Sequence, residues 1–176
     1  MESGKPAREN YAYSKHGSCS VLAAIEPKTG KRLAHVKEQR TKKEFAFFMF
    51  DLVKSYPEAV KIKVVLDNLN THEYSAFYQE FDAETAAWLT EKIEFVFTPK
   101  SASWLNMIEI EFSALSRQCL NRRIPFIKKL ESEVLHFFKE RSQKGIKINW
   151  QFTQEDARKK LNRRYSEVNS ANSKYK

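Results

Sequence analysis

The chain has 176 residues, of which 41% are apolar and only four are glycine, and its formal net charge is +9. This length suits one domain with its own core, and the scarcity of glycine argues against an all-β fold with many tight turns. No apolar run reaches the length of a membrane-spanning helix, no signal peptide is visible, and Cys19 and Cys119 stand alone, so we expect buried thiols in a reducing cytosol.

The positive charge is concentrated in the last third of the sequence. Residues 1–113 contain 15 basic and 16 acidic side chains, whereas residues 114–176 contain 16 basic and 6 acidic ones. A basic lobe beside a neutral body is typical of proteins that bind polyanions. A solvated tail kept basic for solubility has the same composition, so charge alone leaves both interpretations open.

The first half of the chain predicts alternating strands and helices after a polar N-terminal arm at 1–16. Strands are expected at 20–25, 31–36, 61–66 and 93–97, the first two joined by the turn sequence PKTG. Thr41 and Glu44 have capping-box spacing at the start of a helix that ends at Pro57. Residues 73–91 predict two helical pieces, broken near Phe81 and Asp82.

The second half predicts helices only. One apolar stripe begins near Trp104 and consists of Leu105, Ile108, Phe112, Leu115 and Cys119. After Pro125, a second stripe consists of Ile127, Leu130, Val134, Phe137 and, as its one polar member, Arg141. Thr153, with Asp156 three residues later, begins a short basic helix that contains RKKLNRR.

This order of elements predicts an α/β fold in which helices flank a mixed sheet. Active sites of such folds lie beyond the carboxyl ends of strands, and Asp67 directly follows the strand at 61–66. A carboxylate there can bind Mg²⁺, which takes one or two protein carboxylates. An aspartate that only forms a turn or a helix cap fits the same position.

Two other acids and one histidine are candidates for the same site. Glu109 and Glu111 flank the stripe of the helix that begins near Trp104, and periodicity does not choose between them; either can also be an ordinary solvated glutamate. His72 follows Asp67 by five residues and could orient a carboxylate, contact phosphate or make a local hydrogen bond. No Cys/His cluster indicates zinc, and no glycine-rich phosphate loop indicates a nucleotide-driven motor.

Three segments resemble the transposases of the insertion-sequence 630 group, which are related to mariner. VVLDNLNTH at 64–72 is similar to the motif around that group's second catalytic aspartate. FTPKSASWLNMIEIEFSALSRQCLNRRI at 97–124 is similar to the block that carries the third carboxylate, and NWQFTQEDARKKL at 149–161 resembles the C-terminal end. GKPAR near the start and PKTGKR in the hairpin also fit, so the resemblance spans nearly the whole chain.

The resemblance implies a ribonuclease-H-like fold and cleavage and strand transfer on DNA with Mg²⁺ or Mn²⁺. It assigns Asp67 as the second aspartate and Glu109, within LNMIE, as the glutamate, both as metal ligands, in preference to Glu111. Further side chains that could contact DNA or support the site are His72, Asn106, Arg117, Arg122 and Arg123.

The same resemblance puts the group's first aspartate, on the first strand of the sheet, upstream of GKPAR, together with a helix-turn-helix region. We therefore expect residues 17–165 to be a DDE transposase catalytic domain truncated on its N-terminal side, and 166–176 to be a basic polar tail. Such a domain would be inactive alone in the bacterial cytoplasm and would need self-association or an upstream transposase fragment. The alternatives are a non-catalytic DNA-binding remnant that acts through the basic last third, or a basic helical module for RNA or a protein.

Overall fold

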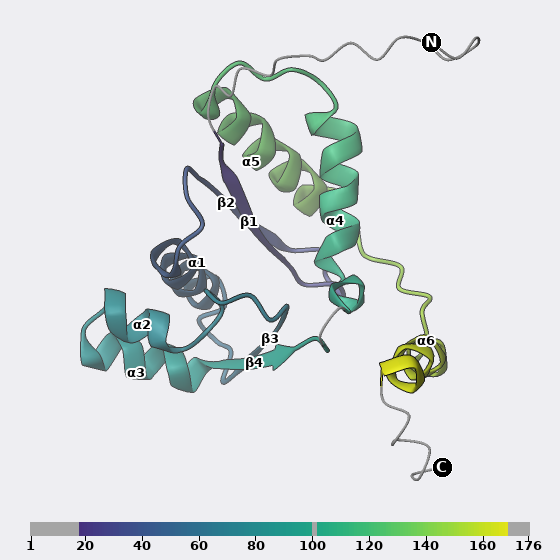
Figure 1. The fold of residues 1–176 in the computed structure, drawn as a ribbon. Coiled ribbons are helices and arrows are strands. Elements are labelled where there is room, and N and C mark those ends of the chain that lie inside the picture. Colours follow the sequence, from purple (N-terminus) through teal and green to yellow (C-terminus); the bar gives the residue numbers. More distant parts are fainter. Residues whose placement is uncertain (1–17, 100–101, 169–176) are drawn as a thin grey trace, which may run out of the picture.

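The computed structural model describes residues 18–99 and 102–168 (Figure 1). The strands are β1 (Ser20–Ile25), β2 (Arg32–Lys37), β3 (Ile62–Leu66) and β4 (Ile93–Phe97). The α-helices are α1 (Lys42–Lys54), α2 (Ser75–Glu80), α3 (Ala83–Lys92), α4 (Ile108–Leu115), α5 (Ile127–Gln143) and α6 (Gln154–Val168). A 3-10 turn, η1 (Ser103–Leu105), precedes α4, and a π-helical turn, η2 (Ser116–Leu120), follows it.

The predicted α/β class is confirmed, and the arrangement is consistent with a ribonuclease-H-like fold. The expected N-terminal arm at 1–16 and the end of the expected tail, 169–176, lie outside the described residues. Among the described helices, none is both long and apolar enough to cross a membrane.

The four strands form two separate pairs. β1 and β2 pair antiparallel from Ser20↔Lys37 to Ile25↔Arg32, and β3 and β4 pair parallel from Ile62↔Ile93 to Leu66↔Phe97. Both pairings of the expected mixed sheet are therefore present, but within the described residues no fifth strand joins the pairs. Local sequence specifies which segments become strands, whereas the neighbour of each strand depends on the rest of the fold.

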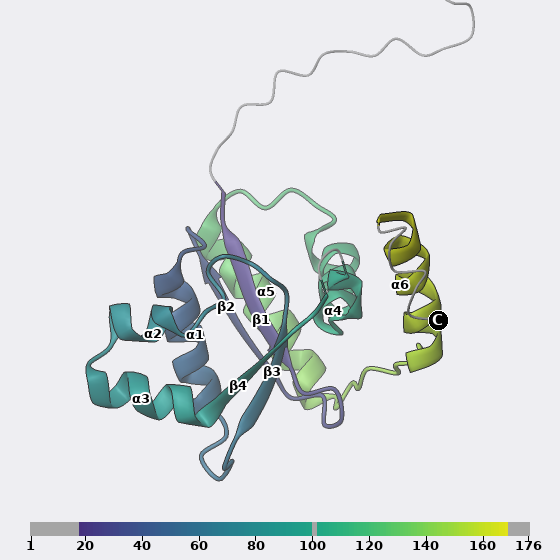
Figure 2. The ribbon, with the colours of Figure 1, turned by 60° about the horizontal axis from the view of Figure 1, so that its bottom comes forward.

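Helices cover both faces of the β1–β2 hairpin, as Figures 1 and 2 show. Leu22, Ala24 and Leu33 pack against the core that α1 shares with α2, α3, β3 and β4. Residues on the other face, including Val21, Ala23, Ala34 and Val36, pack against α4, η2 and α5. Burial on two faces explains why SVLAAI reads as a continuous apolar run instead of an alternating one. Because α1 also packs on β3, it links the two strand pairs.

Local capping signals specify several helix ends correctly. Thr41 Oγ1 accepts a hydrogen bond from the Lys43 amide at 3.2 Å, and Glu44 accepts one from the Thr41 amide at 2.9 Å, which completes the capping box. Asp82 caps α3, so the predicted break there is confirmed. The helix predicted from Leu105 onward instead begins at Ile108, because the extended backbone of Asn106, with ψ of 117°, interrupts it.

Candidate active site

Asp67 lies at the carboxyl end of a parallel strand pair. Leu66, the last residue of β3, is buried, and its carbonyl accepts a hydrogen bond from the Thr98 amide at 2.9 Å. Asn68 donates from its side chain to the Thr98 carbonyl at 2.5 Å. These contacts fix the loop that follows each strand, so the backbone that carries Asp67 is tied to its neighbour.

His72 lies against the Asp67 carboxylate. Its ring stacks on Phe45 with centroids 4.7 Å apart, and its Nδ1 lies 2.9 Å from Asp67 Oδ1. That approach lacks the alignment of a hydrogen bond, so Oδ1 is buried without a hydrogen-bond partner among the described residues, although the Asp67 side chain as a whole is 46% exposed. The exposed part of this side chain therefore lies on its other atoms, so a cation would reach Asp67 through Oδ2.

Asn106 connects the start of α4 to β3. Its side-chain amide donates to the Val65 carbonyl at 3.4 Å, and its side-chain oxygen accepts from the Ile108 amide at 3.2 Å. The Glu109 amide donates to the Asn106 carbonyl at 3.1 Å. One residue therefore contacts the strand that leads to Asp67 and begins the helix turn that carries Glu109.

Glu109 and Glu111 have opposite environments. Glu109 is exposed, and no hydrogen bond or ion pair of its carboxylate is seen within the described part of the chain. Glu111 is 1% exposed, so the interpretation of Glu111 as a solvated helix residue is wrong. Two residues along an α-helix correspond to a rotation of about 200°, so the two carboxylates point to nearly opposite sides of α4.

Two arginines hold the Glu111 carboxylate. Arg32 on β2 donates to both of its oxygens at 2.8 Å, and Arg141 on α5 donates to both at 3.0 Å. Arg32, whose side chain is fully buried, also donates to the carbonyl of Ile146 at 2.8 Å. Burial alone would raise the pKa of Glu111, but the hydrogen bonds from the two guanidinium groups outweigh it and hold the pKa below its ordinary value.

This network, which we call the Glu111 triad (Arg32, Glu111 and Arg141), was missed by reasoning from sequence. One signal was present, because Arg141 is the single polar member of the apolar stripe on its helix. The triad leaves Glu111 without free lone pairs for a metal and fixes the rotation of α4. With Glu111 turned inward, Glu109 faces outward.

The arginines expected to bind DNA lie at the far end of this helix. Arg117 donates to the Ser113 carbonyl at 3.3 Å, and Arg122 pairs with Glu133 at 2.6 Å, while Arg123 is exposed. Arg117 lies in η2, and Arg122 and Arg123 follow it, 13 and 14 residues after Glu109. These three residues are thus separated from the carboxylates by most of the length of α4 and η2.

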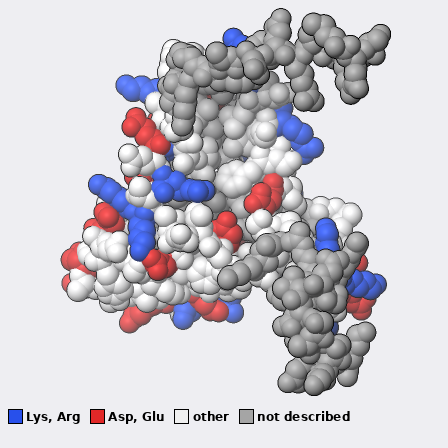
Figure 3. Space-filling model, in the orientation of Figure 1, with Lys and Arg blue, Asp and Glu red and all other residues white. Residues whose placement is uncertain are grey.

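The oxygen atoms present suit a hard divalent cation. Mg²⁺ binds through one or two carboxylates and leaves its other positions to water and phosphate, which matches the partly exposed Asp67 and the exposed Glu109. No group of three or more His, Cys, Asp and Glu side chains able to hold a metal occurs among the described residues. Figure 3 shows exposed acidic side chains on the central face of the molecule among mostly uncharged neighbours.

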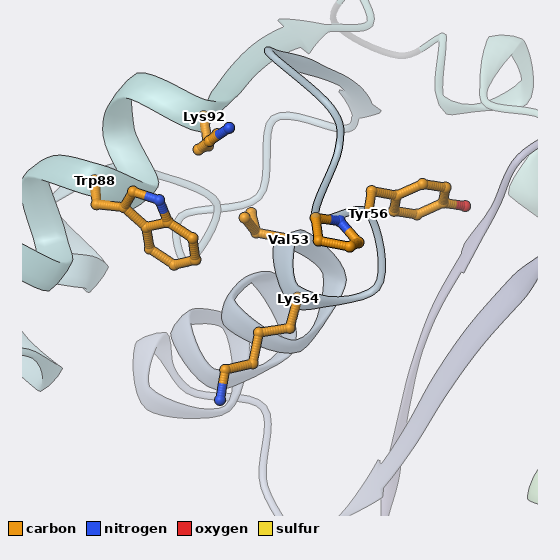
Figure 4. Close-up of a pocket in the computed structure, with 6 residues that line it drawn as sticks. Val53, Lys54, Tyr56, Trp88 and Lys92 are labelled. Atoms are coloured by element: carbon orange, nitrogen blue, oxygen red, sulfur yellow. The ribbon is translucent and has the colours of Figure 1, made fainter.

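A hollow away from these carboxylates does not offer an alternative site. It is lined by Val53, Lys54, Tyr56, Pro57, Trp88 and Lys92, as Figure 4 shows. Lys92 donates to the Ala59 carbonyl at 2.7 Å, and Lys54 lies over the ring of Phe50, so both amines are engaged. The hollow contains no carboxylate or nucleophile, and we assign it no chemistry.

Comparison with known proteins adds the family. Residues 1–131 match the family described as DDE superfamily endonuclease. A comparison with curated proteins found no match to this chain. The matched region includes β3 with Asp67, η1 and the whole of α4 with Glu109. Because the match covers most of the sequence, the chain belongs to the DDE superfamily endonuclease family.

Proposed function

We propose that this chain is the catalytic part of a DNA transposase of the insertion-sequence 630 group, and that it cleaves and joins phosphodiester bonds with Mg²⁺ or Mn²⁺. The observation that carries the proposal is the contact between Asn106 and β3, because Glu109 lies one helix turn beyond Asn106 and Asp67 directly follows β3. The DDE endonuclease family and the VVLDNLNTH and LNMIE segments support DNA as the substrate.

Metal binding and positioning would be separate roles of the side chains in this site. A divalent cation, when bound, supplies the charge that activates the attacking oxygen and stabilises the leaving oxygen of a phosphodiester. Asp67 and Glu109 hold it through carboxylate oxygens, and neither needs to form a covalent bond with DNA. His72, stacked on Phe45, restricts the rotamers of Asp67, and Asn106 keeps the helix start against β3.

The site is completed by a third carboxylate from a strand that pairs with β1 and β3. The resemblance to the insertion-sequence 630 group implies this third carboxylate on a first strand, and the described strands form two pairs that share the cover of α1 without a strand between them. Val65 and Val96, which pair with each other in β3 and β4 and so lie on one face of the sheet, are 50% and 40% exposed, which suits a face that further structure covers. The strand would come from an upstream portion of the transposase.

The test is Mn²⁺-dependent cleavage of DNA that carries the terminal repeats of such an element. We expect little cutting by this chain alone, and cutting when the upstream fragment is added. Asp67→Asn and Glu109→Gln should each abolish that cutting, whereas Glu73→Gln, which removes an exposed acid paired with Lys42, should not. Cutting that survives both site variants would refute the catalytic assignment, and strong cutting by the chain alone would refute the need for a third carboxylate.

A non-catalytic DNA-binding remnant is the second candidate, favoured by the excess of basic residues after position 113. Both candidates predict DNA binding that is insensitive to Asp67→Asn. They differ in metal affinity, which this substitution lowers only if the site is catalytic.

A further inference from the structure

Helix α6 exposes basic side chains beyond a first turn that carries two acids, Glu155 and Asp156. Asp156 Oδ2 accepts hydrogen bonds from the Thr153 hydroxyl at 2.7 Å and from its amide at 3.1 Å, so this acid is used at the start of the helix. Arg158 and Lys159 follow in the next turn and are exposed. An ion pair of either side chain is not seen among the described residues, so their charge is free to meet an anion from solution.

α6 is held to the body of the protein through Trp104. The ring of Phe152, just before the helix, packs edge-on against Trp104 with centroids 5.1 Å apart. Trp150 packs on Phe152 at 6.1 Å, and the Lys160 amine lies 4.6 Å from the centroid of Trp104. Trp104 thus contacts both the segment that leads into α6 and the helix itself. A cation–π contact of this kind is attractive and favours one docked position.

The docking residue lies beside the candidate site. Trp104 belongs to η1, two residues before Asn106 and five before Glu109. Figures 1 and 2 both show α6 on the flank of α4, and in Figure 1 it lies toward the end where α4 begins. Arg122 and Arg123, by contrast, come after η2, at the opposite end of α4 and η2 from Glu109. α6 therefore docks beside the segment that leads into Glu109, whereas Arg122 and Arg123 follow the far end of that segment.

We propose that α6, docked on Trp104, binds the phosphate backbone of duplex DNA and holds it against the candidate site. This surface comprises Trp104, Phe152, Arg158, Lys159 and Lys160. The identification of the polyanion as DNA rests on the proposed function. Contacts of this kind follow the backbone without reading sequence, and their strength falls steeply with salt. Charge kept only for solubility would not need a fixed position beside a catalytic centre.

Fluorescence anisotropy of a labelled DNA duplex, in EDTA, tests the surface without any catalysis. The variant Arg158→Gln/Lys159→Gln removes two exposed charges from α6. Each lost phosphate contact makes the negative slope of log K against log salt shallower by about 0.9. We therefore expect the magnitude of the slope to decrease by roughly 2 and the affinity to drop at all salt concentrations. The matched control Lys128→Gln/Lys139→Gln removes two exposed charges from α5 and should change the slope by much less. Equal losses in the two double variants would overturn the proposal.

Two further variants separate docking from charge and from catalysis. Trp104→Ala keeps every charge but removes the docking ring, so affinity should fall several-fold while the α5 control stays near wild type. An unchanged affinity in Trp104→Ala would overturn the role of docking. Asp67→Asn should bind the duplex as well as wild type in EDTA. Failure of the catalytic assignment would appear only in Mn²⁺-dependent cleavage, so the two proposals fail by different measurements.

Discussion

Replacing Glu111 by glutamine removes the negative charge at the centre of the Glu111 triad. Arg32, Glu111 and Arg141 join β2, α4 and α5 through four hydrogen bonds of 2.8 to 3.0 Å. Glutamine has nearly the same shape but offers one oxygen instead of two, and its amide nitrogen would face a guanidinium donor. The buried Arg32 would then lose its counter-ion and cannot be deprotonated.

The expected loss of stability is large for a single substitution. Breaking a buried ion pair by removing one partner costs about 3–5 kcal/mol, because the remaining charge stays buried and uncompensated. In a domain of this size, 1 kcal/mol corresponds to about 2–4 °C, so the melting temperature should fall by roughly 6–20 °C.

Urea unfolding followed by circular dichroism measures this loss. Glu109→Gln is the matched control, since it makes the same chemical change two residues away at an exposed position and should alter the unfolding free energy by less than about 0.5 kcal/mol. Similar losses in the two variants would refute the assignment of Glu111 as the buried structural glutamate and of Glu109 as the free one.

Three further predictions concern pH, the β1–β2 turn and a helix cap. Folding lowers the pKa of Glu111, so the stabilisation from its charge is present above pH 4.5, the ordinary pKa, and is lost as the pH falls through the pKa of the folded state. The difference in unfolding free energy between wild type and Glu111→Gln should therefore become smaller as the pH falls below 4.5. Gly30→Ala should lower the free energy of unfolding more than Gly145→Ala in the same urea assay. Both glycines have positive φ, but a Cβ at Gly30 would lie 2.7 Å from the Ile146 carbonyl oxygen, whereas a Cβ at Gly145 would meet nothing within 4 Å. Equal losses of stability in the two variants would contradict this packing. Thr41→Ala should cost about 1 kcal/mol through the lost capping box, and a change within error would mean that α1 does not depend on it.

Elements with strong local signals could be predicted from the sequence. KIKVVL, the capping box at Thr41 and the break at Asp82 each depend on residues close together in the chain, and the structure has the strand or helix end within about one residue of the expected position. Cys119 is buried as expected, whereas Cys19 is only half-buried. The pairing of β1 with β2 was also predicted from the PKTG turn between them. The separation of the strands into two pairs could not be obtained in this way, because it depends on contacts between distant segments.

The different environments of Glu109 and Glu111 also could not be predicted from nearby residues in the sequence. Glu109 and Glu111 flank the same apolar stripe, so helical periodicity treats them alike. What distinguishes them is Arg32, 79 residues away, and Arg141, 30 residues away. The preference for Glu109 came from the LNMIE segment alone, and the occupied carboxylate of Glu111 now gives a physical reason that supports it.

Paramagnetic line broadening by Mn²⁺ tests most directly whether Asp67 and Glu109 share a cation. In a ¹⁵N-labelled sample titrated with Mn²⁺, the amide signals next to both residues should broaden together at the lowest metal concentrations. Asp67→Asn should abolish the broadening near Glu109, and Glu109→Gln should weaken it near Asp67, while Glu111 variants that remain folded still bind the ion. Broadening confined to one of the two residues, or unchanged by substitution of the other, would contradict a shared metal site.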